Sequence, residues 1–280
     1  MRVVVIAGVG LIGGSFALAL RKAGFDGRIV GVGSERTIQE ALALGVIDQG
    51  APLHEAAPRA DLLMLSHTIS HILETIPILD ALVKPDCLIT DAGSTKGAIV
   101  DCARKNVRRT QFLGGHPMAG SEARGVGAAS ADLFRGRTWV LTPGNAEELA
   151  TPAANEFRHW LSAIGAVEMI LAPDEHDRVV ALTSHLPQLA STALAETVAA
   201  GLASDDQLRA GGPGLADMTR LALSSYEVWK DILDTNTVAV ARALDIYLAS
   251  LAEVRRRLDP PQLEDDFRRA ADFRAKLASR

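Results

Sequence analysis

A short glycine-rich segment near the start of the chain has the spacing of a phosphate-binding turn. It reads GVGLIG over residues 8–13 and follows an apolar, β-branched run at residues 2–7. After a strand, the first glycine permits a tight turn, the second admits a diphosphate, and the third allows close helix–strand packing. The diphosphate would rest on unpaired amides at the helix N-terminus. We therefore predict a dinucleotide site with cofactor contacts from Gly8, Gly10, Leu11, Ile12 and Gly13.

The segment after the second predicted strand bears on the choice of cofactor. NAD binding favours a carboxylate about 20 residues past the glycine turn, where it accepts hydrogen bonds from the ribose 2′-hydroxyl. This chain has Gly33 there, followed by Ser34 and Arg36, which suit a 2′-phosphate. Both are also ordinary loop residues, and Glu35 can still reach a ribose. The pattern favours NADP over NAD, and Ser66 is predicted on the cofactor side as well.

Two further polar segments stand where predicted strands end. One reads DAGSTK over residues 91–96, and the other reads GGHPMAGSE over residues 114–122. An open α/β sheet places its ligands at the carboxyl ends of its strands. His116 is then a candidate general base on a glycine-rich turn, because imidazole titrates near neutral pH. The alternative for His116 is a residue that only structures a turn.

The elements that must position these residues alternate between strands and helices. Apolar runs at residues 28–32, 62–66, 87–91, 112–115, 138–142 and 166–171 predict further strands, and residues 37–44, 69–82 and 95–104 predict helices. Such a series is typical of a doubly wound parallel sheet of the Rossmann type. We expect this α/β domain to cover residues 1–172.

The pattern changes after residue 172 to Ala- and Leu-rich segments with a helical period. These segments cover residues 175–201, 215–224, 226–258 and 261–279, and the third would span about nine helical turns. A helix of that length usually packs against more than its own domain. We predict an all-helical domain over residues 173–280 that binds substrate and forms a homodimer.

Composition excludes several classes of protein. The net charge of −5 argues against nucleic-acid binding, which needs a basic face. Two cysteines cannot build a disulfide framework or a CxxC metal site. We find no apolar stretch of the roughly 20 residues that a membrane span needs. We expect a soluble, cytoplasmic protein without a metal centre.

Several segments together resemble one enzyme family. The glycine segment, the two polar segments, SHLP at residues 184–187 and DMTR at residues 217–220 occur in the order found in prephenate and arogenate dehydrogenases. The resemblance implies oxidative decarboxylation of a cyclohexadienol in tyrosine biosynthesis, with hydride transfer to NAD(P)⁺. It also implies that His116 is the base and that Ser94 hydrogen-bonds near the reacting hydroxyl.

The same resemblance assigns the substrate side of the site to five residues. Arg220 matches the family arginine that binds the ring carboxylate, for which a guanidinium is well shaped. Secondary contacts fall to His176 and His185 by family position, and a kink at Pro187 would turn His185 and Gln188 towards the substrate. Glu122 is assigned to an ionic network at the entrance or to an amine on the substrate.

Each of these residues also has a structural alternative. Ser94 suits a helix N-cap, Arg220 a surface ion pair, and each helical histidine a satisfied interior position. Lys96 is either a cation on the cofactor side or a solvated lysine in a first turn. His67 and His71 have metal-pair spacing without a third ligand, so we expect them near the cofactor.

Two other functions compete with this interpretation. A 3-hydroxyacid or 6-phosphogluconate-type dehydrogenase also joins a Rossmann domain to helices, but it uses a lysine base on the helical domain. The helical half here has only Lys230 and Lys276, neither in such a motif. A non-catalytic dinucleotide sensor would keep the glycines without needing Ser94, His116 and Arg220.

Overall fold

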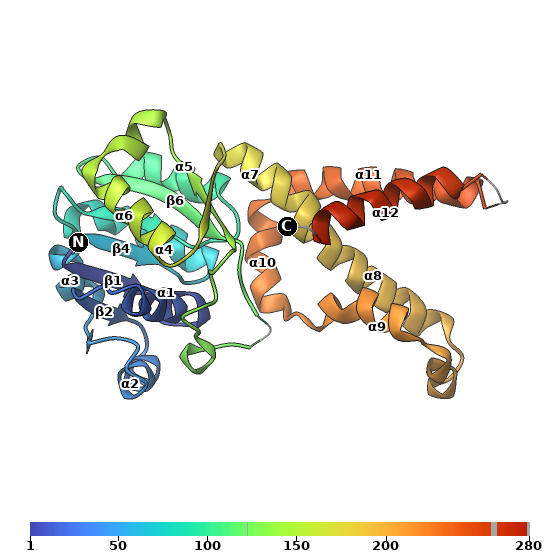
Figure 1. The fold of residues 1–280 in the computed structure, drawn as a ribbon, viewed down its shortest axis with the longest axis horizontal. Coiled ribbons are helices and arrows are strands. Elements are labelled where there is room, and N and C mark those ends of the chain that lie inside the picture. Colours follow the sequence, from blue (N-terminus) through green and yellow to red (C-terminus); the bar gives the residue numbers. More distant parts are fainter. Residues whose placement is uncertain (122, 259–261, 279–280) are drawn as a thin grey trace.

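The N-terminal half of the chain is built on one eight-stranded sheet (Figure 1). The computed structural model describes residues 1–121, 123–258 and 262–278. The strands lie in the order β3-β2-β1-β4-β5-β6-β7-β8. Their bounds are β1 Val3–Ala7, β2 Arg28–Val32, β3 Gln49–Gly50, β4 Leu62–Leu65, β5 Leu88–Asp91, β6 Gln111–Pro117, β7 Thr138–Thr142 and β8 Val167–Ile170.

Strand direction makes this sheet a Rossmann sheet with an extended edge. The strands from β3 to β6 pair in parallel, β7 pairs antiparallel to β6, and β8 pairs parallel to β7. Strand order reverses beside β1, and ligands of open α/β sheets bind outside the carboxyl ends at that point. The predicted fold class is confirmed. The reversed β7 and the two-residue β3 were not predicted, because neither changes the apolar pattern of its own segment.

Helices cover both faces of the sheet because side chains alternate along each buried strand. Val4 and Ile6 pack on one face against α1, while Val5 and Ala7 pack on the other against α4. The helices of this half are α1 Leu11–Lys22, α2 Glu35–Ala43, α3 Leu53–Ala56, α4 Ile69–Leu82, α5 Gly97–Asn106 and α6 Pro152–Ala163.

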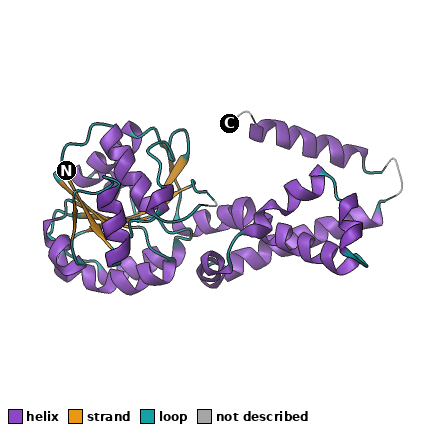
Figure 2. Cartoon of the chain, turned by 90° about the horizontal axis from the view of Figure 1, so that it is seen from below, coloured by secondary structure: helices purple, strands orange, loops and turns teal. Residues whose placement is uncertain are grey.

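The C-terminal half is helical in every element that the structure describes. It contains α7 Pro173–Val180, a π-helical turn η4 Ala181–His185, α8 Leu186–Gly201, α9 Pro213–Thr219, a 3₁₀ turn η6 Arg220–Leu223, α10 Tyr226–Thr235, α11 Thr237–Arg256 and α12 Glu264–Ala278. The half extends away from the sheet, and α7 and α10 lie against the first half (Figure 1). Helix α12 stands apart from the other helices (Figure 2).

The prediction of a single long helix over residues 226–258 is wrong, because the structure has two helices there, α10 and α11. The chain breaks between α10 and α11 at Asn236, whose φ and ψ are −130° and 23°. The break is stabilised by a buried polar contact, because the Asn236 side-chain amide donates to Asp177 O at 2.9 Å. The apolar period continues through the break, so periodicity alone could not detect it.

The kink predicted at Pro187 lies one turn earlier. The chain widens into η4 just before Pro187, which then occupies the first turn of α8. A proline is tolerated there because the first amides of a helix have no intrahelical acceptor. Within the described residues, no helix is both long enough and apolar enough to traverse a bilayer.

Candidate active site between the two domains

The glycine turn connects β1 to α1 and has no room for side chains at two of its positions. Gly8 has φ of +101°, and a Cβ there would lie 2.8 Å from the carbonyl carbon of Ser66. A Cβ on Gly13 would lie 2.2 Å from Gly8 O. The Ser66 hydroxyl donates to Gly8 O at 2.7 Å. Ser66 therefore secures the turn from the end of the neighbouring strand, and its predicted contact to the cofactor stays a prediction.

The second glycine of the turn, Gly10, faces open space. A Cβ on Gly10 would have no heavy atom within 4 Å. Gly10 also precedes α1, whose N-terminus has no side-chain cap and no acidic residue in its first turn. Unpaired amides at a helix N-terminus attract phosphate groups. The open face and the helix end together fit the diphosphate of a dinucleotide.

A cleft of about 540 Å³ opens beside this turn, between the two halves of the chain. The glycine turn contributes Leu11 and Ile12, and the loop after β6 forms another wall. The helical half supplies Leu223, Ser224, Ser225, Val228 and Trp229. A second hollow of about 210 Å³ shares Ile12 and Val228 with the cleft and is also lined by Ser66, His67, Gly93, Ser94 and Asp231. Both hollows lie at the carboxyl ends of strands of the sheet, beside the residues that come after β1, β4 and β5.

Ser34 and Arg36 lie at the carboxyl end of β2. Ser34 caps α2 by accepting from Thr37 N at 3.3 Å. Arg36 is exposed in the first turn of α2 and has no hydrogen bond or ion pair with another described residue. The cation is therefore available to a ligand on this edge of the sheet.

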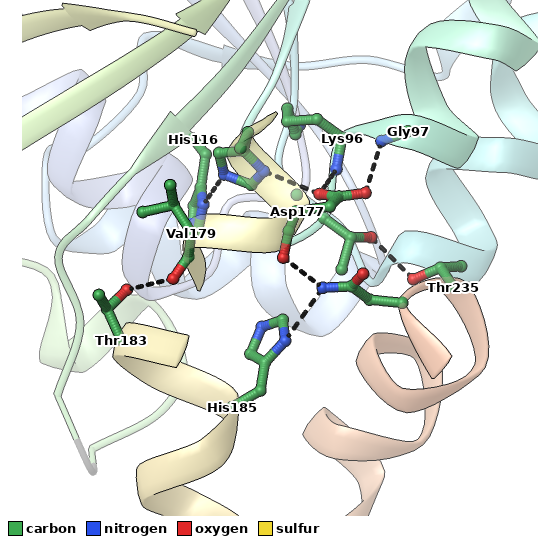
Figure 3. Close-up of polar contacts among 12 residues, drawn as sticks. Lys96, Gly97, His116, Asp177, Val179, Thr183, His185 and Thr235 are labelled. Atoms are coloured by element: carbon green, nitrogen blue, oxygen red, sulfur yellow. Dashed lines mark hydrogen bonds and ion pairs between the residues drawn. The ribbon is translucent and has the colours of Figure 1, made fainter. Parts of the chain in front are cut away.

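His116 occupies strand β6 itself, and not the turn after it as predicted. Its Nδ1 lies 2.8 Å from Nε2 of His176 (Figure 3). Its Nε2 makes no hydrogen bond with any described residue, and the residue is 9% exposed. Burial lowers the pKa of His116 well below its usual value, and the nearby His176, Lys96 and His185 lower it further. An imidazole in this state is neutral at pH 7 and can accept a proton.

A buried ion pair braces the strand that carries His116. Lys96 bonds to Asp91, and neither side chain is exposed to solvent. Lys96 Nζ also donates to Gly115 O at 2.7 Å, and Asp91 accepts from Gly115 N at 3.1 Å. Lys96 is thus neither a solvated lysine nor a cation on the cofactor side, the two alternatives left by the sequence. The pair fixes the backbone directly before His116.

Asp177, which the sequence did not single out, joins the two domains. Its Oδ1 accepts from Lys96 N at 2.7 Å, and its Oδ2 accepts from Gly97 N at 2.8 Å. These amides begin α5, so Asp177 caps that helix, and Ser94 does not. Oδ1 also lies 2.8 Å from Nδ1 of His176 (Figure 3). Its position next to a histidine was the only available sequence signal.

The three predicted helical contacts to substrate have interior positions instead. His176 is fully buried between His116 and Asp177. His185 is 1% exposed, packs edge-on against Trp229, and hydrogen-bonds Asn236. Burial lowers the pKa of His185 to about 4, with Asp177 opposing the shift and His176 adding to it. Both side chains are buried, as that of His116 is, and their contacts to substrate stay predictions.

Gln188 holds the backbone beside Arg220. It is buried, and its amide donates to Leu221 O at 2.8 Å. Arg220 is exposed at the start of η6, three residues before the segment that lines the cleft. Ser94 is half-buried on the smaller hollow. Glu122 lies outside the described residues.

Two histidines, His67 and His71, lie close together after β4, the third strand predicted from the sequence. The rings of His67 and His71 have centroids 4.6 Å apart and are tilted by 56°, and His67 lines the smaller hollow. Burial and the neighbouring His71 lower the pKa of His67 to about 4. No group of three or more His, Cys, Asp or Glu side chains suited to a metal ion occurs among the described residues.

Two family models match consecutive parts of the chain. The model described as "Prephenate dehydrogenase, nucleotide-binding domain" matches residues 16–170, and "Prephenate dehydrogenase, dimerization domain" matches residues 172–272. The chain is 33% identical to a prephenate dehydrogenase of Bacillus subtilis, over 99% of this chain and 76% of that protein. The chain belongs to the prephenate dehydrogenase family.

Solved structures agree with this assignment. A prephenate dehydrogenase of Aquifex aeolicus, in complex with hydroxyphenyl propionate and NAD⁺, has a TM-score of 0.89 and 31% identity, covering 99% of this chain and 98% of that one. A Synechocystis arogenate dehydrogenase has a TM-score of 0.82 and 29% identity over 98% and 99%. The predicted family and its dehydrogenase activity in tyrosine biosynthesis are confirmed, as is a pyridine nucleotide cofactor. The roles of individual residues stay predictions.

Proposed function

We propose that this chain oxidises and decarboxylates prephenate, with His116 as the base, and that arogenate is the alternative substrate. Both are cyclohexadienols with a ring carboxylate and a 4-hydroxyl, and they differ in a keto or amino group on the side chain. The observation that carries the proposal is the bond from His116 Nδ1 to His176, while Nε2 has no hydrogen bond with any residue that the structure describes. An Aquifex relative that binds NAD⁺ and a hydroxyphenyl acid supports the substrate class.

The base in this reaction takes up a proton and then returns it. The 4-hydroxyl proton passes to His116 Nε2 while hydride leaves the carbon that bears the hydroxyl. When bound, the nicotinamide supplies the hydride acceptor. As CO₂ leaves, the electron pair of its C–C bond enters the ring and gives a phenolate, which recovers the proton from His116. No net proton is released, so a base of depressed pKa is sufficient, because it returns the proton readily.

The substrate carboxylates require cationic or polar partners outside the base. We assign the ring carboxylate to Arg220, because a guanidinium binds a carboxylate with two parallel hydrogen bonds. The bond from Gln188 to Leu221 O supports this role by holding the backbone beside Arg220. Ser94, on the smaller hollow, is assigned to the reacting hydroxyl. Glu122, outside the described residues, is assigned to an ionic network at the entrance or to an amine on the substrate.

We assign NADP as the preferred cofactor. The carboxyl end of β2 is followed by Gly33 instead of an acid, and Arg36 is exposed there without a described partner. A cation at this place suits a 2′-phosphate, whereas NAD binding favours a carboxylate. Gly8, Gly10, Leu11, Ile12 and Gly13 would hold the diphosphate.

We also propose a homodimer formed by a helical domain over residues 173–280, with the nucleotide domain over residues 1–172. The second matching family model is described as a dimerization domain. Helices α11 and α12 expose large apolar side chains: Ile246, Leu248, Leu251, Val254, Phe267, Phe273 and Leu277. Light scattering coupled to size-exclusion chromatography tests this proposal, and a monomer at micromolar concentration would refute it.

The deciding experiment is a kinetic comparison of both substrates with both cofactors. Reduced nicotinamide is followed by its absorbance, and the aromatic product by chromatography. We expect the highest kcat/KM with prephenate and NADP⁺. Turnover of neither substrate with either cofactor would refute the proposed function. A clear preference for arogenate would select the alternative substrate.

A further inference from the structure

The carboxylate of Asp177 is the end of a hydrogen-bonded chain that leads to His116. It lies on α7 of the helical half and receives two backbone amides from the nucleotide domain, of Lys96 and Gly97. The remaining contact of Oδ1 is His176 Nδ1 at 2.8 Å. Burial raises the pKa of Asp177, but the hydrogen bonds from His176 and the two amides lower it more, so the net shift is downward. The group is therefore ionised at neutral pH.

An ionised carboxylate can only accept hydrogen bonds. This determines which nitrogen donates and which accepts along the series from Asp177 through His176 to His116. Nδ1 of His176 must then carry its proton and donate to Asp177. In a neutral imidazole the other nitrogen is an acceptor. Nε2 of His176 therefore accepts from Nδ1 of His116, at 2.8 Å. The proton of neutral His116 resides on Nδ1, and the lone pair of Nε2 is left for the substrate.

We propose that Asp177 is a positioning residue that, through His176, holds His116 in the one tautomer able to act as the base. The inference rests on the proposed function, in which His116 is that base. Neither His176 nor Asp177 needs to touch substrate or cofactor. The arrangement also depends on the docking of the two domains, because the same carboxylate caps α5 of the nucleotide domain. We therefore expect His116 to act as the base only when the two domains are docked, with Asp177 of α7 bound to the first amides of α5.

Nitrogen NMR tests the tautomer directly, because protonated and unprotonated ring nitrogens have distinct chemical shifts. The chain has seven histidines, and His116→Asn and His176→Gln assign the two signals that matter. At pH near 7.5 we expect the wild-type His116 to carry its proton on Nδ1. A signal from protonated Nε2 in the folded wild type would overturn the proposal, whatever the kinetics of any variant.

Two variants at position 176 test the order of donors and acceptors in the hydrogen bonds between Asp177 and His116. In His176→Gln, the amide nitrogen can donate to Asp177 while the amide oxygen accepts from His116, so the polarity is kept. His176→Leu removes both bonds. We expect the Gln variant to have at least ten-fold higher kcat than the Leu variant, at equal KM for the cofactor. Equal kcat values in two folded variants would count against a directional role.

The variant at position 177 tests the origin of the effect. Asp177→Asn removes the negative charge and introduces N–H groups, so His176 is no longer required to donate. We expect kcat to fall by about 10²-fold, with a part of His116 now protonated on Nε2. Wild-type kcat and an unchanged tautomer in this variant would overturn the proposal. If Asp177→Asn does not fold, the proposal is still tested by the NMR signal of wild-type His116 and by the comparison of His176→Gln with His176→Leu.

A matched control separates the tautomer from the loss of an interdomain cap. Asp231 on α10 accepts from Ser70 N at 2.9 Å and so caps α4 from the helical half, and it makes no hydrogen bond or ion pair with a histidine among the described residues. Asp231→Asn should lower the melting temperature without changing the tautomer of His116. His116→Asn tests the proposed function separately. If that variant is inactive while Asp177→Asn behaves as wild type, only the tautomer proposal fails.

Discussion

Lys96 and Asp91 form an ion pair in which neither side chain has any exposed surface, directly behind the strand that carries His116. Such a pair is weak evidence for stability, because the cost of removing two charges from water offsets their attraction. Its contacts to both the amide and the carbonyl of Gly115 give it a different use. The pair fixes the backbone that orients the base, and its cation adds to burial and to His176 in lowering the pKa of His116.

Replacing Lys96 by methionine should therefore destabilise the fold strongly. The change leaves Asp91 as an uncompensated buried charge, which typically costs about 3–5 kcal/mol. Denaturant titration measures the free energy of unfolding. Lys22→Met is the matched control, because Lys22 and Asp132 form a solvent-exposed pair at 2.6 Å whose loss should change the free energy of unfolding little. A similar loss in the two variants would show that the burial of the Lys96 pair has no energetic consequence.

His116→Asn should remove the base while leaving the cofactor site intact. General base catalysis contributes about 10²–10⁴-fold, so kcat should fall by that factor. His116 lies outside both hollows, and the glycine turn is formed by other strands, so the Kd for NADP⁺ should stay within about two-fold of wild type. Calorimetry measures the Kd and steady-state kinetics the kcat. A variant with near wild-type turnover would remove His116 from its proposed role.

The depressed pKa of His116 predicts the shape of the pH profile. The base acts in its neutral form, so activity is lost only as pH falls through its folded pKa, which lies well below 6.5. We expect kcat/KM to be flat across neutral pH, with its acid limb well under 6.5. Observation of a limb at 6.5 or above would contradict the environment described for this histidine.

The free energy of unfolding, like the activity, should fall as the pH is lowered below neutrality. His116 and His185 have lowered folded pKa values, about 4 for His185, so the unfolded chain binds their protons first as pH falls. Their contribution is complete above the unfolded pKa near 6.5 and declines below it, at about 1.4 kcal/mol per pH unit for each group. Unfolding titrations between pH 7 and 5 measure this slope. In His185→Gln the slope should be smaller.

The glycine turn, the alternating strands and the sequence position of His116 could all be predicted because each depends on local spacing. Neighbouring residues impose the turn, and one apolar run marks each buried strand. The burial of Lys96 could not be predicted, because it depends on Asp91 and on a domain that folds from residues about eighty positions later. The residues next to a lysine in the sequence do not distinguish a buried lysine from a solvent-exposed one.

The helical half shows the same limit more clearly. Asn236 interrupts a continuous apolar period, and only its contacts with Asp177 and His185 explain the break. His176 hydrogen-bonds its sequence neighbour Asp177, but the position of that carboxylate depends on the distant amides of Lys96 and Gly97. Resemblance to the family identified both helical histidines as relevant, but resemblance carries no information on which of them faces the substrate.

Two glycines of the turn should respond differently to alanine. In Gly13→Ala the new Cβ would lie 2.2 Å from Gly8 O, so the backbone must shift, at a cost of about 1–3 kcal/mol. In Gly10→Ala the Cβ meets open space, so the fold should lose about 1 kcal/mol at most. The same Cβ would fill the space assigned to the diphosphate, so binding of NAD⁺ and NADP⁺ should weaken at least ten-fold. Tight cofactor binding by a folded Gly10→Ala variant would contradict the assigned position of the diphosphate.

Arg36→Ala should change the choice of cofactor rather than catalysis. A charge-assisted hydrogen bond to phosphate contributes about 1.5–3 kcal/mol, so the KM for NADP⁺ should rise by about ten- to hundred-fold. NAD⁺ lacks the 2′-phosphate, so its KM should hardly change. Glu35→Gln is the neighbouring control, because a ribose contact by Glu35 would appear as weaker NAD⁺ binding in that variant. Equal losses for the two cofactors in Arg36→Ala would refute the assignment of Arg36 to the 2′-phosphate and, with it, the preference for NADP.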